Sequence, residues 1–300
     1  MNMSWDEAGV DRGTGEPGAD RPRLVVGDDG SPAADQVWAW VNNHHWPGWR
    51  ISVVTARKPL EPAPVGAERA RPHPWEPSHP RELINGDDAV VEHLLAEEDP
   101  RLALDCCHEA RLLAIGPRGK GLHKRLHIGS TADWLVSSGR PLVPVALVRS
   151  PRPTRRILLC VDGSPNSRRA VTSLTALPWV AGCRVEVLGV DERGDGFVTA
   201  AVDDTVSLLD ESGICDVGSV VMGSLAGSMF DVRAAILSTI DDSAPDLVAL
   251  GARGTGGFAG LFIGSVASAV AHHAPCSVLI APSRTAAQLE ESQIDETPFD

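Results

Sequence analysis

The sequence predicts an α/β protein made of two tandem, doubly wound domains, each with a five-stranded parallel sheet. Apolar runs of strand length alternate with helical segments, which implies parallel pairing through right-handed crossovers. The motif D-G-S-P occurs at Asp29 and at Asp162, 133 residues apart. The spacing G-x-x-G, nine residues, G-S begins at Gly116 and again at Gly251, 135 residues apart. Two landmarks with nearly one offset indicate a duplicated fold joined near residues 149–156, a segment rich in Pro and Arg.

Length and charge restrict the class of protein. The chain has 300 residues, enough for two domains that each bury a core, and a formal net charge of −13. Such a charge argues against general binding to nucleic acid or to anionic membranes. No apolar run reaches the roughly 18–20 residues that span a bilayer. The N-terminus has early acidic residues and no apolar core, so it does not look like a secretory signal, and we expect a cytoplasmic protein.

The second copy, expected over residues 154–282, shows the pattern most clearly. Each predicted strand is an apolar run that ends at Gly, Asp or Pro, and Pro245 ends the helix before the fourth strand. The predicted strands are 156–161, 184–190, 215–222, 246–250 and 276–281, and the predicted helices are 166–177, 198–212, 230–242 and 265–273. Such sheets bind ligands at the carboxyl ends of their strands, where Asp162 and the loop 251–264 would emerge together.

The first copy, expected over residues 22–148, is eroded. Its predicted strands are 24–26, 51–55, 90–95, 112–115 and 142–148. The proline-rich insertion 57–80 stands where the second helix belongs, so that helix is expected to be short or missing. Asp99 and Pro100 fit an N-cap and a first helical residue, which predicts a helix to about residue 109. The polar ends, 1–21 and 283–300, are expected to be disordered tails.

The glycine-rich loops are candidate phosphate sites. Glycines after a strand let backbone N–H groups turn inward, and the helix that follows adds its N-terminal donors. Ser265 is expected both to cap that helix and to donate to a phosphate oxygen. The other interpretation is that the glycines only form tight turns. In the first copy the loop also carries positive charge, on Lys120, His123, Lys124, Arg125 and His127.

Asp29 and Asp162 each follow the first strand of their copy and allow two interpretations. In one, the carboxylate forms an Asx-turn or a helix cap, as is common for D-G-S-P. In the other, it accepts a hydrogen bond from a base amino group or a ribose hydroxyl across the cleft from the phosphate loop. The two roles are compatible.

Together with the closing run AHHAPCSVLIAP, these motifs resemble the universal stress protein family in its tandem two-domain form. The resemblance covers about residues 22–148 and 154–282, and it implies an adenine-nucleotide α-hydrolase-like fold that binds ATP, alone or with Mg²⁺. It places the nucleotide of the second copy at Asp162, Val190, Leu250, Gly251, Arg253, Gly254, Gly264, Ser265 and Val266. The matching residues of the first copy are Asp29, Ile115, Gly116, Arg118, Gly119, Gly129, Ser130 and Thr131.

The first copy departs from the family pattern at the adenine side. Asp28 stands where the strand should still be apolar, and the second strand ends at Thr55 before the insertion. The family's closing His-Ala-Pro-Cys is replaced by SSGRPLVPVALV. The second copy keeps the full set, so ATP is expected there first.

No set of residues looks catalytic. Arg118 and Arg253 could reach a phosphate, but no base or metal-binding carboxylate accompanies them. We therefore expect a binding and signalling module in which any ATP hydrolysis is slow and incidental. One alternative is a nucleotide-independent scaffold, and another is an enzyme of the wider adenine-nucleotide α-hydrolase-like group. In either domain the fifth strand is an edge, and the resemblance implies that the two edges pair, within one chain as a pseudo-dimer or between chains as a homodimer.

Several other features have ordinary interpretations. The six cysteines lie in apolar contexts and are expected to be buried thiols, although Cys106, Cys107 and His108 leave open a redox pair or partial metal site. HIGS at 127–130 lacks the second histidine of a nucleotidylyltransferase signature and follows the wrong strand. The adjacent pairs His44-His45 and His272-His273 diverge on a helix, which is poor metal geometry. Core packing is the expected role of four tryptophans, Trp38, Trp40, Trp134 and Trp179.

Overall fold

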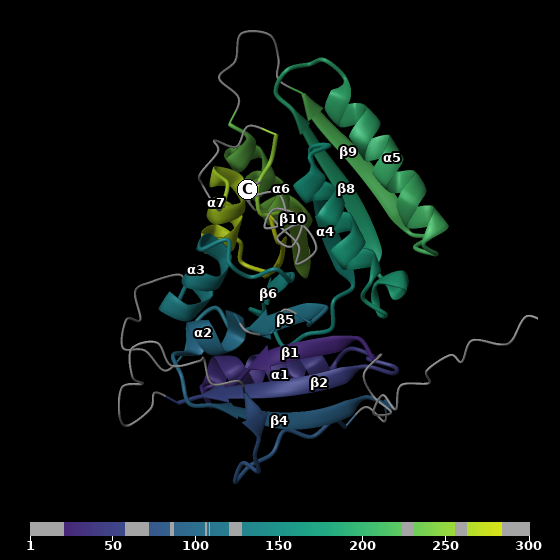
Figure 1. The fold of residues 1–300 in the computed structure, drawn as a ribbon. Coiled ribbons are helices and arrows are strands. Elements are labelled where there is room, and N and C mark those ends of the chain that lie inside the picture. The colour runs from purple at the N-terminus through teal and green to yellow at the C-terminus, as the bar shows by residue number, and fades with distance from the viewer. Residues whose placement is uncertain are drawn as a thin grey trace, which may run out of the picture.

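One continuous sheet runs through the protein (Figure 1). The computed structural model describes residues 21–57, 72–84, 87–105, 107, 109–119, 128–223, 231–255 and 263–283. The strand order is β3-β4-β2-β1-β5-β6-β11-β10-β7-β8-β9. It contains two parallel five-stranded units, β4-β2-β1-β5-β6 and β9-β8-β7-β10-β11, with the same internal order. This confirms the predicted α/β fold of two tandem, doubly wound domains, called domain 1 and domain 2 below.

Domain 2 follows its predicted elements closely. The turn residues at 162–164, Pro245 and the glycine at 264 end or begin elements within two residues of the expected positions. The elements are β7 (Arg156–Val161), α4 (Pro165–Thr175), η1 (Val180–Gly182), β8 (Arg184–Asp191), α5 (Phe197–Glu211), β9 (Val217–Gly223), α6 (Val232–Ser243), β10 (Leu247–Gly251), α7 (Ser265–His273) and β11 (Ser277–Ala281).

Domain 1 has the same strands but shorter helices after β2. Its elements are β1 (Arg23–Gly27), α1 (Pro32–Asn42), β2 (Arg50–Ala56), β3 (His73–Pro74), β4 (Val90–Ala96), α2 (Pro100–Asp105), β5 (Leu112–Ile115), α3 (Ser130–Ser137) and β6 (Val145–Leu147). Two predicted bounds were too long: α2 ends at Asp105 rather than near residue 109, and β6 covers only three residues of 142–148. Pro144 directly precedes β6 and has no N–H to donate to a neighbouring strand.

No helix occurs among the described residues between β2 and β4, but residues 58–71 lie outside the described residues, so the loss of the second helix stays a prediction. The end of the insertion covers this region. β3 pairs antiparallel with the end of β4, through His73 with Leu95 and Pro74 with Leu94. Farther on, the carbonyl of Glu82 accepts a hydrogen bond from Trp38 Nε1 on α1 at 3.2 Å. The insertion therefore packs against α1 and closes the outer edge of β4, because an edge strand needs cover.

The two domains join through their fifth strands. β6 and β11 are antiparallel, with Val145, Ala146 and Leu147 opposite Ile280, Leu279 and Val278. All the strand pairings within the two five-stranded units are parallel. Edge pairing within one chain is the pseudo-dimer expected from the sequence.

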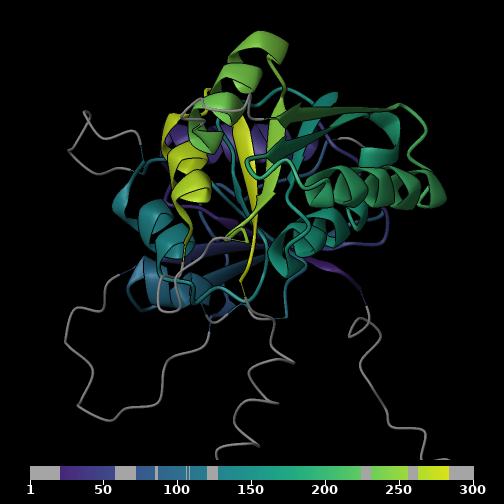
Figure 2. The ribbon, with the colours of Figure 1, turned by 90° about the horizontal axis from the view of Figure 1, so that it is seen from above.

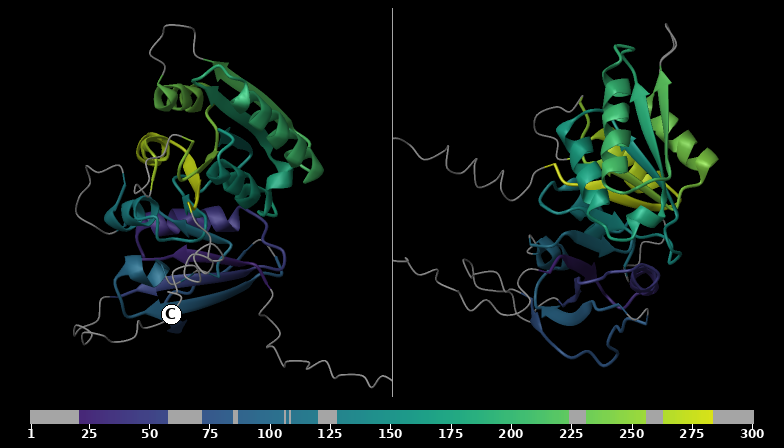
Figure 3. Two further views of the ribbon diagram at one scale, coloured as in Figure 1. Left: turned by 45° about the horizontal axis from the view of Figure 1, so that its top comes forward. Right: turned by 90° about the vertical axis from the view of Figure 1, so that its right-hand side faces the viewer.

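Helices cover both faces of the sheet, as Figures 2 and 3 show. One buried cluster collects side chains from α1, α4 and α5, and the other collects side chains from α2, α3, α6 and α7. Four tryptophans, Trp40, Trp46 and Trp49 of domain 1 and Trp179 of domain 2, form a chain of edge-to-face contacts in the first cluster. Trp38, Trp40 and Trp179 are buried and Trp134 is partly buried, so core packing is confirmed for these residues.

The termini and parts of the loops lie outside the described residues. This applies to the predicted tails before residue 21 and after 283, to Cys106 and His108, and to the basic segment 120–127. In the described part of the chain, no helix is both long enough and apolar enough to cross a membrane.

Candidate functional site

Asp162 ties the first turn of domain 2 to the glycine loop. Its Oδ1 accepts a hydrogen bond from the N–H of Ser164 at 3.0 Å, which is the expected Asx-turn. Its Oδ2 accepts from the N–H of Thr255 at 2.8 Å, in the loop after β10. The carboxylate therefore holds together the two segments that leave the sheet at the switch point between β7 and β10.

Domain 1 repeats this arrangement. Asp29 Oδ1 accepts from the N–H of Ser31 at 3.0 Å. A Cβ added at Gly119 would collide with Asp29 Oδ2, just as a Cβ at Gly254 would lie 2.5 Å from Asp162 Oδ2. The second glycine of each loop thus packs directly against the carboxylate, and a side chain there would displace the carboxylate from its present position.

Gly251 and Gly264 of the domain 2 loop differ in how closely other atoms pack around them. A Cβ at Gly251 would lie 2.6 Å from the backbone carbonyl of Asn166 at the start of α4, so packing alone requires this glycine. A Cβ at Gly264 would meet nothing closer than 3.5 Å, and Gly264 has an ordinary φ of −78°. Among the described residues, packing therefore gives no reason for a glycine at position 264, and the turn interpretation covers only part of the motif.

Gly264 stands at the N-cap of α7 and leaves that cap empty. At the start of α4, the N-cap Ser164 has a φ of −69° and a ψ of 158°, and its hydroxyl accepts from the N–H of Ser167. Gly264 has nearly the same backbone, with a ψ of 159°, but offers no side chain. Gly129 does the same for α3. Within the described residues, no side chain caps α3 or α7, so their first N–H groups can donate to a bound acceptor.

Three predicted site residues, Ser265, Leu250 and Ile115, occupy positions other than those expected. Ser265 is the first helical residue and not the cap, which corrects the expectation that it caps α7. Its side chain is exposed, as is that of Ser130 in domain 1. The side chains of Leu250 and Ile115 are buried in the core, so only their backbone borders the loops.

Positive charge gathers beside the domain 2 loop. Arg253 lies in the loop, and Arg169 lies on α4, where its Nη1 donates to Asn166 Oδ1 at 2.7 Å. Burial lowers the pKa of Arg169, and the positive charge of Arg253 lowers it further. Two guanidinium groups close enough to repel each other make a good environment for an anion. The sequence pointed to Arg253 but not to Arg169, although a spacing of three from Asn166 puts Arg169 on the helix face that meets the loop.

The chain is similar to known proteins. Residues 228–282 match the family model described as Universal stress protein family. Similarity to the universal stress protein family extends to curated proteins and to solved structures. Universal stress protein Rv2005c of Mycobacterium tuberculosis is 27% identical over 234 residues, which cover 67% of this chain and 72% of that protein.

Solved structures share the fold over nearly the full length of the chain. A universal stress protein from Archaeoglobus fulgidus has a TM-score of 0.57 at 16% identity and covers 86% of this chain and 97% of its own. A putative universal stress protein from Pseudomonas aeruginosa has a TM-score of 0.56 at 16% identity and covers 91% of this chain and 98% of its own. Both match a chain of about this length, in keeping with the tandem form of the family.

The expected adenine side of domain 2 includes one residue that the sequence did not single out, Phe197. Val190 is partly buried at the end of β8 and pairs in register with Met222 of β9. Phe197 begins α5 and is 53% exposed. Its ring packs on Gly163, directly after Asp162, because a Cβ at Gly163 would fall 2.5 Å from the ring. An exposed aromatic ring beside Asp162 offers a face on which a base can stack.

The same region in domain 1 is filled by the chain itself. Asp28 receives a hydrogen bond from Arg81 Nε at 2.8 Å, and Arg81 also pairs with Asp35 of α1. The N–H of Arg81 donates to His93 Nε2 on β4. The carboxylate that interrupts the family pattern is thus neutralised by an arginine from the end of the insertion. This supports the expectation that domain 1 is the weaker nucleotide site.

Thiols and metal ligands add nothing to the site. In the described residues, no group of three or more His, Cys, Asp or Glu side chains is placed to hold a metal ion. Cys107, Cys160, Cys183 and Cys276 are buried free thiols, as expected, whereas Cys215 is exposed. Burial raises the pKa of Cys160 to about 12 and that of Cys276 to about 11, which makes both thiols unreactive at neutral pH.

Proposed function

We propose that domain 2 binds ATP, alone or with Mg²⁺, and that this cytoplasmic universal stress protein acts as a binding and signalling module in a stress response. The observation that carries the proposal is the empty cap of α7. Gly264 holds the backbone conformation of a serine cap, and serine there would stabilise the helix by roughly a few tenths of a kcal/mol relative to glycine. A glycine that gives up this stabilisation is explained by a phosphate that takes the place of the cap.

The surroundings support a triphosphate. Arg253 and Arg169 lie beside the loop and supply charge-assisted donors. The exposed hydroxyl of Ser265 lies at the same helix end. The base would lie toward Val190 and Phe197, on the other side of the Asp162 turn. Among the described residues beside the loop we identify no general base, so binding is the proposed activity and slow hydrolysis is expected.

The experiment that tests the proposal replaces Gly264 by serine. If the glycine serves only the turn, Gly264→Ser adds a cap to α7, raises stability slightly and leaves any ligand binding intact. If the empty cap binds phosphate, the new hydroxyl satisfies the helix donors and occupies the site. We then expect ATP affinity to fall by at least tenfold with stability unchanged or higher. Isothermal titration with ATP and Mg²⁺ and urea unfolding give the two readouts.

A control variant separates binding from a general effect of serine. Gly182 lies in η1, where an added Cβ meets nothing within 4 Å, and Gly182→Ser should leave ATP binding unchanged. Nucleotide released from freshly purified, denatured protein is identified by mass spectrometry. No nucleotide in the protein, together with no heat on titration, would refute the proposal.

The scaffold interpretation has one observation in its favour. β9 is the outer strand of domain 2 and has a single strand neighbour, β8, among the described residues. Val220 and Val221 of β9 are both exposed. An open edge of this kind can pair with another chain. The Gly264→Ser experiment also decides here, because a nucleotide-independent scaffold predicts no ATP binding in either form of the protein.

A further inference from the structure

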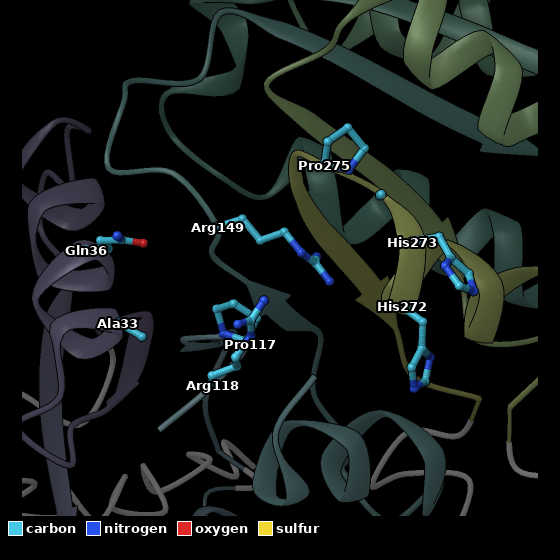
Figure 4. Close-up of a pocket in the computed structure, with 9 residues that line it drawn as sticks. Ala33, Gln36, Pro117, Arg118, Arg149, His272, His273 and Pro275 are labelled. Carbon is cyan, nitrogen blue, oxygen red and sulfur yellow. The ribbon is translucent and has the colours of Figure 1, made fainter. Parts of the chain in front are cut away.

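A cleft opens where the two domains meet. Its volume is about 480 Å³, within the roughly 300–1,000 Å³ of small-molecule sites. It lies between the start of α1, the glycine loop of domain 1, the segment after β6 and the C-terminal end of α7 (Figure 4). The lining residues are Ala33, Gln36, Pro117, Arg118, Arg149, His272, His273, Ala274 and Pro275.

Arg149 crosses the junction between the domains inside this cleft. It follows β6, and its guanidinium donates to the carbonyls of Ala271 and Cys276 at the end of α7. Its backbone N–H donates to Ser277 Oγ at 3.1 Å. A guanidinium has five N–H donors, so two carbonyls leave others for a ligand in the cleft. Figure 4 shows the Arg149 guanidinium between Arg118 on one side and the two histidines on the other.

The charges around Arg149 are unbalanced. Arg118 is exposed on the domain 1 loop, and its positive charge adds to burial in lowering the pKa of Arg149. No carboxylate belongs to the described residues that line the cleft. Asp133 of α3 lies 3.3 Å from His272 Nε2, while His272 Nδ1 donates to the Ser268 carbonyl. In a chain of net charge −13, two like-charged arginines kept together need a compensating anion.

We propose that this cleft is a second anion site, built jointly by both domains, which holds a ligand bearing one or two phosphate groups. Arg118 and Arg149 provide charge-assisted donors from domain 1 and the segment that follows it, and His273 provides a ring nitrogen from domain 2. The site goes beyond the nucleotide site of domain 2 and shares Pro117 and Arg118 with the domain 1 loop. A ligand held here contacts both domains and favours the arrangement in which they meet.

The test uses pyrophosphate as the probe and the Gly264→Ser protein as the background, so that the domain 2 loop is blocked. Isothermal titration should give one pyrophosphate per chain. Arg118→Gln and His273→Gln should each weaken it by about 10- to 100-fold, since hydrogen bonds to charged groups of this kind contribute on that scale. Both side chains are exposed, so the variants should fold. Arg149→Gln should abolish binding, and circular dichroism shows whether that variant keeps its fold.

The control is Arg152→Gln in the same background. It removes an exposed arginine three residues after Arg149 that does not line the cleft, and it should leave pyrophosphate affinity unchanged. Absence of heat with pyrophosphate overturns the proposal. So does an affinity for pyrophosphate in the Arg118→Gln and His273→Gln variants that equals the affinity of the Gly264→Ser background protein. The result is independent of the ATP experiment: pyrophosphate binding with no ATP binding refutes only the nucleotide site, and the reverse refutes only the cleft.

Discussion

Protonation of one buried histidine should weaken the protein in mild acid. His44 lies between the rings of Trp40 and Trp179, with ring centroids 4.5 and 4.4 Å away, and is only 4% exposed. Its Nδ1–H donates to the Trp40 carbonyl at 2.7 Å, and its Nε2 accepts from the Thr154 N–H at 2.9 Å. Both nitrogens are therefore used by the neutral ring, and a second proton would break the bond to Thr154, which lies in the segment between the domains.

The structure gives the size of the effect. Burial, the largest cause, together with the nearby His45, lowers the pKa of His44 from its ordinary 6.5 to about 4, against a smaller opposing effect of the bond to Trp40. The unfolded chain takes up a proton below pH 6.5, whereas the folded protein takes it up only near pH 4. Stability from this group is thus complete above pH 6.5 and is lost as the pH falls from 6.5 to 4. At about 1.4 kcal/mol per pH unit, the loss is about 3 kcal/mol.

Urea unfolding followed by circular dichroism at several pH values between 7.5 and 4.5 measures this slope. His44→Gln removes the titrating group, so its stability should fall with pH by less than that of the unmodified protein, with a difference approaching 3 kcal/mol toward pH 4. His45→Gln is the matched control, because the His45 side chain is largely exposed and pairs with Asp87 at the surface. Equal pH slopes for His44→Gln and the unmodified protein would refute the reasoning.

Three further predictions concern packing, charge and thiol reactivity. Gly254→Ala should lower the free energy of unfolding by about 1–3 kcal/mol, because the added Cβ falls 2.5 Å from Asp162 Oδ2; an unchanged urea midpoint would contradict this. Arg81→Gln should cost about 1–3 kcal/mol by leaving the largely buried Asp28 without its cation, whereas Arg101→Gln, which removes an exposed pair with Asp99, should leave the midpoint in place. Among the cysteines of the described residues, Cys215 should react first with a thiol reagent, and Cys160 only on unfolding; early modification of Cys160, read by peptide mass spectrometry, would show that its pKa is not raised.

Local signals in the sequence located most of the fold. The turn at Asp162 and the glycine at 264 fix where β7 ends and α7 begins, because both depend on neighbours within a few residues. The alternation of apolar strands with helices, and the similar spacing between the repeated motifs, predict the same strand order in both domains. Two copies of one repeat are expected to adopt the same fold. The candidate site followed from the same motifs, and its glycines were identified without knowing which of them packing requires.

Local sequence patterns do not predict contacts between residues far apart in the chain. Nothing near Arg81 in the sequence indicates that it pairs with Asp28, because the two are 53 residues apart and meet only through the path of the insertion. Arg149 was assigned to a linker, yet its guanidinium holds the end of α7, 122 residues away. The distinct role of Gly264 also needed coordinates, since the free space around a Cβ depends on how the loop and helix pack.

The antiparallel junction of β6 and β11 sets the directions in which the two halves face. Parallel strands within each half end together, so at the junction the carboxyl ends of the two sets of strands point in opposite directions. Each half therefore presents its own set of strand ends, and substitutions at one set can accumulate without altering the other.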